Sequence, residues 1–226
     1  MDLSKLEKIT GHQFKNKNLL KEALTHRSYL NENPSWGIPH NERLEFLGDA
    51  VLELAVSEEL FQKYPDYDEG KLTSIRAALV NYQMLAKVAG DIELGKFILL
   101  SRGEAKDNGK AREVILANAF ESLLGAVYLD GGYSTVKLFI EKAVIVNLPE
   151  VFEKELYRDP KSLLQEIIQE KLKLTPNYQV LDEHGPDHQK IFKVGVFFND
   201  KLAAEGEGAS KQEAEVEAAK NALKSF

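Results

Sequence analysis

A change of hydrophobic pattern near residue 150 constrains the fold of this 226-residue chain more than any other feature of its sequence. Before that point the apolar residues recur with helical spacing over long stretches, which end at prolines or glycines. After it come a polar stretch and shorter runs that alternate as strands do. The helical stretches cover residues 41–64, 68–90, 113–129 and 134–148. The first part of the chain is therefore predicted to be almost entirely α-helical.

The last third of the chain has a mixed pattern. A helix is expected over residues 160–172, and a closing helix begins at Ser210, a residue type that favours the N-cap. The three strand-like runs between them are Tyr178–Asp182, Ile191–Asn199 and Lys201–Ala209, with a tight turn at Asn199-Asp200. We predict an all-α domain in residues 1–150, a linker in 151–158 and a small α+β domain of order α-β-β-β-α in 159–226.

Composition excludes several classes of protein. The chain has no Cys, which removes disulfides, thiolate nucleophiles and Cys-ligated zinc. It has no run of 18 uncharged apolar residues and no secretory pattern at its start, so we expect no membrane span and a soluble, cytoplasmic protein. Residues 1–156 hold 19 basic and 24 acidic side chains, a net charge of −5, and residues 157–226 hold 10 and 12, a net charge of −2. Bulk charge therefore argues against a general polyanion binder, and the charges have to be read locally.

An acidic stripe runs along one otherwise apolar helix. Glu42, Glu45 and Asp49 are spaced three and four residues apart, which places them on one helical face, and Glu53 continues the stripe one turn on. Like charges at this spacing repel, and the repulsion grows when the helix is mostly buried. Their oxygens are the ligands that Mg²⁺ prefers. The ordinary interpretation is a solvated face of an amphipathic helix, and it is the better one for Glu53.

A second apolar helix favours the metal interpretation for the other acids. Residues 113–129 place Asn118 and Glu121 three apart in the middle of an apolar sequence. Two mostly buried helices with one oxygen-rich patch each are most simply explained if the patches face one another across a metal ion. Asp68-Glu69-Gly70 is a further acidic point that can supply another oxygen.

Three motifs around these residues resemble a known family. NERLEFLGDAVLE at residues 41–53, ILANAFESLLGAVYLD at 115–130 and LTHRSY at 24–29 are similar to the motifs of bacterial ribonuclease III. The resemblance extends from about residue 10 to the end of the chain, and its nine-residue acidic block is matched throughout. It implies hydrolysis of double-stranded RNA to 5′-phosphate and 3′-hydroxyl ends, in processing of ribosomal RNA precursors and other structured messenger and transfer RNA transcripts.

The resemblance also assigns roles to residues. It implies Mg²⁺ as the cofactor, with Mn²⁺ as a possible substitute, and a metal-activated water as the nucleophile. By position, the metal ligands are Glu45, Asn118, Glu121 and Asp49, and the catalytic residues are Asp49, Glu121, Glu42 and Glu69. Asp49 is expected to position the attacking water or a second ion, and Glu42 and Glu69 to contribute from outside the first set of ligands.

Asn118 departs from the family pattern, which usually has Asp at this point. An amide oxygen still coordinates Mg²⁺, but one negative charge is lost. We expect a working enzyme with weakened metal binding. The alternative is a catalytically silent protein that binds double-stranded RNA, and a more distant alternative is an unrelated helical metal protein that binds no duplex RNA.

Phe46 lies about 100° round the helix from Glu45, near the acidic stripe. An apolar helix residue is by default part of the core. The resembled family, however, is homodimeric through this region, with one acidic centre from each subunit. On the resemblance we expect a homodimer with Phe46 at its interface.

The C-terminal part resembles a double-stranded RNA-binding domain, and the sequence GEGASKQEAEVEAA at 206–219 carries much of that likeness. Ser210 and Lys211 at a helix N-terminus suit a phosphate, because free N–H groups and the helix dipole favour an anion there. Gln212 stands where the family usually has a second Lys.

Two further segments carry RNA-binding expectations from the same likeness. The Gly185–His188 segment matches a loop that enters one minor groove, which makes His188 a predicted RNA contact. Ser162, Gln165 and Glu166 match positions that contact the 2′-hydroxyls of the other minor groove.

Overall fold

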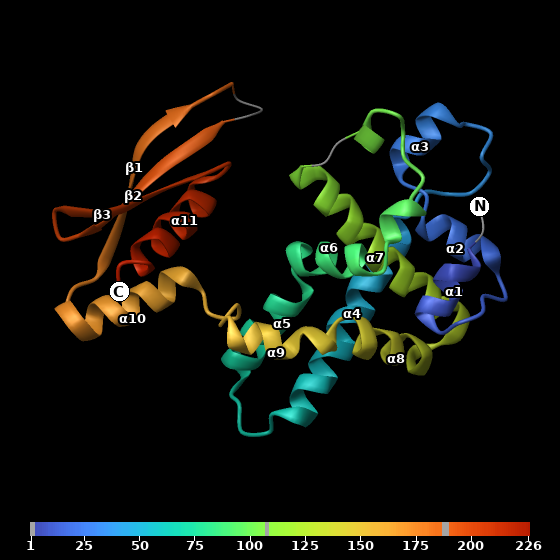
Figure 1. Ribbon diagram of the computed structural model, residues 1–226, viewed down its shortest axis with the longest axis horizontal. Coiled ribbons are helices and arrows are strands. Elements are labelled where there is room, and N and C mark those ends of the chain that lie inside the picture. The colour runs from blue at the N-terminus through green and yellow to red at the C-terminus, as the bar shows by residue number, and fades with distance from the viewer. Residues whose placement is uncertain (1–2, 107–108, 187–189) are drawn as a thin grey trace. The chain divides into compact units, whose positions relative to one another are not determined.

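The computed structural model describes residues 3–106, 109–186 and 190–226. It divides the chain into two compact units, residues 1–157 and 158–226. The first unit is helical, and the second combines a three-stranded sheet with two helices (Figure 1). This confirms the predicted fold class.

The first unit is built around two long helices, α4 (Glu42–Lys63) and α7 (Lys110–Gly131). Ten residues of α7 are buried, and Figure 1 shows the other helices of the unit around it. By length and composition α7 is the one helix in the described ranges that could cross a membrane, but its apolar side chains form the core of this unit. The shorter helices are α1 (Ser4–Thr10), α2 (Lys17–Ala23), α3 (Arg27–Glu32), α5 (Glu69–Val80), α6 (Tyr82–Asp91), α8 (Tyr133–Ala143) and α9 (Leu148–Glu153), with 3₁₀ turns at Leu94–Lys96, Glu104–Lys106 and Ile145–Asn147.

The single helix expected over residues 68–90 is wrong, because the chain forms α5 and α6 there. Asn81 separates them with an extended backbone (φ −68°, ψ 157°), and its side chain accepts a hydrogen bond from the Met84 N–H as the N-cap of α6. The apolar spacing continues across the break, which hides it from a periodicity argument. An Asn inside a helical pattern was the available signal, since Asn favours caps over helix interiors.

The helix expected over residues 134–148 also differs. It ends at Ala143, and α9 then begins at Leu148 with Pro149 inside its first turn, where a missing N–H costs nothing. Val151 and Phe152, in the stretch expected to be a linker, are packed into the first unit: Val151 is fully buried and Phe152 contacts Tyr64. The observed division therefore falls after Tyr157.

The second unit has the predicted order: α10 (Pro160–Leu172), β1 (Pro176–His184), β2 (Ile191–Phe198), β3 (Lys201–Gly208) and α11 (Lys211–Leu223). The antiparallel sheet has the order β1-β2-β3, and Asn199, at φ +52°, forms the predicted turn. Both helices share one core with the sheet, made of Leu164, Ile168, Val196, Ala218, Ala219 and Ala222.

Candidate active site and RNA-binding surface

Two glycines bring the backbones of α4 and α7 into contact. A Cβ atom on Gly48 would lie 1.8 Å from the backbone oxygen of Glu121, and one on Gly125 would lie 2.3 Å from the oxygen of Leu44. Any side chain at either position would push the helices apart. Because Gly48 lies between Glu45 and Asp49, this crossing sets the acidic face of α4 against the middle of α7. The sequence interpretation missed both glycines, although a mid-helix Gly costs roughly 1 kcal/mol relative to Ala and calls for a packing reason.

A buried polar contact fixes the start of α4 against α7. The Ser122 hydroxyl is buried and lies 2.8 Å from the Asn118 carbonyl oxygen and 3.2 Å from that of Asn41. The Asn41 N–H in turn donates to the Thr25 carbonyl oxygen (2.9 Å). Buried polar groups are paired in this way because leaving one unpaired costs about 1–3 kcal/mol. The network joins the 24–29 motif to the site, which explains why that motif accompanies the acidic block.

The carboxylates of the crossing act on one another. Burial raises the pKa of Glu121 to about 8, and the negative charges of Asp49 and Glu45 add to the effect. Burial likewise raises the pKa of Glu45, with contributions from Glu42 and Asp49. The Asn118 side chain donates a hydrogen bond to the Glu45 carboxylate, which opposes this rise. The structure thus places the four predicted metal ligands at one helix crossing, where the charges of Glu45, Asp49 and Glu121 act on one another and Asn118 bonds to Glu45.

The donor set suits a hard divalent cation, since it consists of three carboxylates and one amide on adjacent helices. Within residues 3–106, 109–186 and 190–226, no three His, Cys, Asp or Glu side chains are gathered closely enough to count as a formed metal cluster. The fourth proposed donor, Asn118, is an amide and is therefore not counted among these side chains. Burial and, after it, repulsion from Asp49 and Glu45 keep a proton on Glu121, and a bound cation would offset both effects.

The two outer acids are placed differently. Glu42 begins α4 at the edge of the cluster, is half-exposed, and pairs with Arg27 (3.6 Å) and His40 (3.8 Å). Glu69 begins α5, and its carboxylate accepts a hydrogen bond from Thr73 (3.3 Å) on the same helix. The structure therefore places Glu42 where its charge acts on Glu45, whereas the contact that it gives Glu69 lies on α5 itself.

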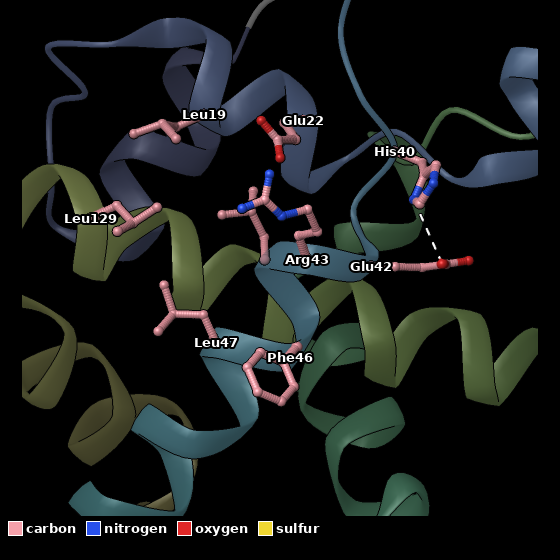
Figure 2. Close-up of a pocket in the computed structure, with 9 residues that line it drawn as sticks. Leu19, Glu22, His40, Glu42, Arg43, Phe46, Leu47 and Leu129 are labelled. Carbon is pink, nitrogen blue, oxygen red and sulfur yellow. Dashed lines mark ion pairs between the residues drawn. The ribbon is translucent and has the colours of Figure 1, made fainter.

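Phe46 is not part of the core, since 81% of its surface is exposed. It stands at the rim of a hollow of about 620 Å³ with apolar walls from Leu19, Leu44, Leu47 and Leu129. Figure 2 shows Phe46 beside Leu47, with Leu129 and Leu19 on the opposite wall and Arg43 turned toward Glu22. Within this chain Phe46 has an apolar hollow next to it and little covering it.

The start of α11 carries the residues predicted to bind phosphate. Ser210 caps the helix and accepts a hydrogen bond from the Glu213 N–H (3.1 Å), as predicted. The Lys211 ammonium lies 3.4 Å from the Glu183 carboxylate and over the Phe192 ring (5.6 Å). The sequence interpretation missed Glu183, whose contact holds Lys211 toward the end of β1.

The α10 candidates Ser162, Gln165 and Glu166 are exposed, and Ser162 donates from both its N–H and its hydroxyl to the Asp159 carboxylate (2.9 Å each). His188 lies outside the described residues. The structure therefore places five of the six predicted RNA contacts, on α10 and at the start of α11.

Comparison with known proteins decides the family. Residues 16–148 match the model described as Ribonuclease-III-like, and residues 160–225 match the double-stranded RNA binding motif. The chain belongs to the ribonuclease III family. It is similar to Ribonuclease 3 of Carboxydothermus hydrogenoformans, with 49% identity over 98% of this chain and 94% of that protein. Ribonuclease 3 of Dehalococcoides mccartyi strain 195 is 43% identical over 100% of this chain and 95% of the relative.

Solved structures agree with this membership in the ribonuclease III family. The nuclease domain of the ribonuclease III of Campylobacter jejuni, in a structure concerned with flexibility in a region involved in dimer formation, aligns with a TM-score of 0.59. The two sequences are 43% identical, and the alignment covers 66% of this chain and 99% of that domain. As a ribonuclease III, the chain is an endoribonuclease with a double-stranded RNA-binding domain.

Proposed function

We propose that this ribonuclease III hydrolyses double-stranded RNA at the crossing of α4 and α7 in a reaction that requires a divalent cation, Mg²⁺ or Mn²⁺, and leaves 5′-phosphate and 3′-hydroxyl ends. One observation carries the proposal. The contact at Gly48 sets Glu45 and Asp49 against Glu121, and the pKa of Glu121 is about 8 because the three carboxylates share a partly buried space. Such a set is costly without a cation and suited to holding one.

The chain's own residues have separate tasks in this site. When bound, a divalent cation supplies charge for the phosphorane-like transition state and lowers the pKa of water. Glu45, Glu121 and Asn118 offer the oxygens that hold it, and the Asn118 amide also orients the Glu45 carboxylate by donating to it. Asp49, which is exposed at the open side of the crossing, accepts a hydrogen bond from the attacking water. Glu42 and Glu69 act from outside this set.

The second unit holds the substrate. Ser210 and Lys211 contact phosphates, and Ser162, Gln165, Glu166 and His188 contact the minor grooves. Placed Lys residues suffice for this, because A-form RNA is recognised largely by shape and by its 2′-hydroxyls. We infer that the natural substrates are ribosomal RNA precursors and other structured transcripts in the cytoplasm.

A cleavage assay on long duplex RNA tests the reaction. We expect cutting with Mg²⁺ and with Mn²⁺, no cutting with EDTA, and products that a 5′-phosphate-dependent exonuclease degrades. The matched variants are Glu121→Gln, which should be inactive, and Glu53→Gln, which removes an exposed acid of α4 and should be fully active. A chain that binds the duplex but cuts it with neither metal is the silent RNA-binding protein instead.

We further infer a homodimer through the face that carries Phe46. An isologous twofold interface requires a projection and its receptor on the same face, and here the exposed Phe46 stands beside an apolar hollow. Burying an aromatic side chain removes about 150–250 Å² of surface from water, which stabilises such a contact by several kcal/mol over two copies. The exposed apolar residues Leu54 and Phe61 continue along α4.

Sedimentation of Phe46→Glu tests the dimer. The variant should sediment as a monomer, because a carboxylate cannot enter an apolar hollow without a large desolvation cost. Leu138→Glu is the control, since Leu138 is exposed on α8 and is not one of the residues that line the hollow. A dimer that persists in Phe46→Glu would place the interface elsewhere.

A further inference from the structure

A carboxylate bridges two ammonium groups where β1 and β2 meet the start of α11. Glu183 lies near the end of β1, and each of its two oxygens contacts a different lysine. Its Oε2 atom lies 2.7 Å from the Lys190 ammonium, and its Oε1 atom lies 3.4 Å from the Lys211 ammonium. Lys190 immediately precedes β2, and Lys211 is the first residue of α11. The sequence interpretation gave no role to Lys190 or Glu183.

An aromatic ring holds the same two ammonium groups. Lys190 lies 5.5 Å and Lys211 5.6 Å from the centre of the Phe192 ring, and Phe192 is paired directly with Glu183 in the register of β1 and β2. The face of an aromatic ring attracts a cation. Both lysine side chains are still open to solvent, with exposed fractions of 38% for Lys190 and 59% for Lys211. The group therefore presents two neighbouring positive charges to the outside.

The bridging position of Glu183 is one that a phosphate can take. The hydrogen bond from Lys190 is the main reason why the pKa of Glu183 is lowered, so this carboxylate is charged at neutral pH. A carboxylate and a phosphodiester both offer two acceptor oxygens and a negative charge to ammonium donors. With two positive charges and one negative charge, the group keeps a net positive charge that favours an anion.

Gln212 shows why the second cation of this surface has to come from outside α11. It stands where the family usually has a second Lys, next to Lys211. Its side chain lines a hollow together with Ser162 and Gln165 of α10, whereas Lys211 reaches Glu183 and the Phe192 ring. Neighbouring helix residues point about 100° apart, which accounts for the difference. The ammonium group that shares its contacts with Lys211 therefore belongs to Lys190.

We propose that Lys190 and Lys211 bind one backbone phosphate of the duplex together, and that Glu183 occupies this phosphate site in the absence of RNA and competes with the phosphate. The inference rests on the proposed binding of double-stranded RNA, and it adds a second cation and an internal competitor to the binding surface. Glu183 keeps the two lysines together in the free protein, but its charge repels the phosphate that takes its place. Removing that charge should therefore strengthen the binding of RNA.

Binding of the full chain to an RNA duplex tests the site, measured over a range of salt concentrations in EDTA, which prevents cutting. Glu183→Gln should bind the duplex about three- to tenfold more tightly at low salt, and the gain should shrink as salt screens the charges. Lys190→Ala should weaken binding and lower the slope against salt by roughly one, as Lys211→Ala should. Because the two lysines share one phosphate, their effects should not be additive in the double variant.

Glu205→Gln is the matched control for the change in charge. Glu205 forms a similar exposed ion pair with Lys193 (2.6 Å), so this variant also loses one carboxylate next to a lysine. Lys193 follows Phe192 in β2, and successive strand residues point to opposite faces of the sheet. The control therefore alters the other face, and its binding of RNA should be nearly unchanged. Circular dichroism of each variant checks that these exposed substitutions leave the fold intact.

The outcomes separate this inference from the function on which it rests. If the unaltered chain binds no duplex RNA, the proposed function fails and the inference fails with it. If the unaltered chain binds duplex RNA but Glu183→Gln binds it no more tightly than Glu205→Gln does, the competition is overturned and the function stands. A salt slope that stays the same in Lys190→Ala would likewise remove Lys190 from the phosphate site without affecting the proposed function.

Discussion

Helix α7 carries two carboxylates, Glu121 and Asp130, whose surroundings are opposite. The Asp130 side chain is 4% exposed and accepts hydrogen bonds from the N–H groups of Lys15 (2.8 Å) and Asn16 (2.9 Å) and from the His12 ring (2.7 Å). Burial by itself would raise the pKa of Asp130, but these donors outweigh it and lower the pKa. For Glu121, burial and then the charges of Asp49 and Glu45 act in the same direction and raise the pKa to about 8.

The difference separates a structural acid from a site residue. The negative charge of Asp130 is stabilised by hydrogen bonds from the chain itself. These hydrogen bonds hold residues 12–16 against the end of α7. Glu121 is left with repulsion that the chain itself does not relieve. Strongly perturbed carboxylates of the second kind are typical of sites that bind or react, while paired ones contribute to stability.

Replacing Glu121 should affect chemistry far more than folding. Glu121→Gln should lower the cleavage rate by about a thousandfold or more, with RNA binding retained, because it removes a charge from the metal site. Without divalent metal the variant should be more stable than the unaltered chain at pH 8. A raised folded pKa means that the folded state binds more protons between pH 4.5 and about 8, so stability falls as the pH rises through this window. Single-turnover rates and thermal unfolding in EDTA measure both effects, and a variant that loses RNA binding in parallel would show general damage instead.

Separating α4 from α7 should disrupt the surroundings of Glu121 and leave those of Asp130 intact. Gly48→Ala places a methyl group 1.8 Å from a backbone oxygen, which neither rigid helix can avoid, so we expect a loss of about 3 kcal/mol or more in unfolding free energy and of most activity. Gly90→Ala is the control, because a Cβ there meets nothing within 4 Å. Urea unfolding compares them, and equal stability of the two variants would contradict the close crossing.

Replacing Asp130 should affect folding and not chemistry. Asp130→Asn should cost about 1.5–3 kcal/mol at pH 7, the range for hydrogen bonds to a charged group, with the cleavage rate of the folded protein unchanged. Because the folded pKa of Asp130 is lowered, its contribution is present above the unfolded value of 3.8 and is lost as the pH falls through the folded pKa. The difference in stability between the two proteins should therefore shrink in denaturant titrations as the pH falls below 3.8 and through the folded pKa. The exposed Asp91→Asn serves as control, and a cost that persists at low pH would rule out the charge as its source.

Restoring a charge at position 118 should have the smallest effect. A carboxylate binds a divalent cation more strongly than an amide does, so Asn118→Asp should need about three- to tenfold less Mg²⁺ for half-maximal cleavage. With Mn²⁺ the difference between the two proteins in the metal concentration required should be smaller. Cleavage rates against metal concentration decide it, with binding of Mn²⁺ alone, followed by its electron paramagnetic resonance signal, as a second readout. Identical curves for the two proteins would mean that Asn118 is not a ligand. Cleavage only in the Asp variant would mean that the unaltered chain is an inactive member of its family.

The sequence determined what depends on neighbours along the chain. Helical spacing put Glu45 and Asp49 on one face, and Asn118 and Glu121 on another, while alternation and turn residues indicated the three strands and the cap at Ser210. These features follow from backbone geometry that repeats every few residues. The family motifs were likewise local strings, which is why the fold class and the family could be predicted from sequence alone.

Tertiary structure decided what depends on residues far apart. The break at Asn81 and the helix through Pro149 preserve the apolar pattern, so periodicity alone could not locate them. Only packing shows that Gly48 touches α7, that Phe46 is exposed beside a hollow, and that Gln212 faces α10 while Lys211 faces Glu183. Glu121 and Asp130 look alike in sequence, and they differ because one meets acids from α4 and the other meets N–H groups from residues 12–16.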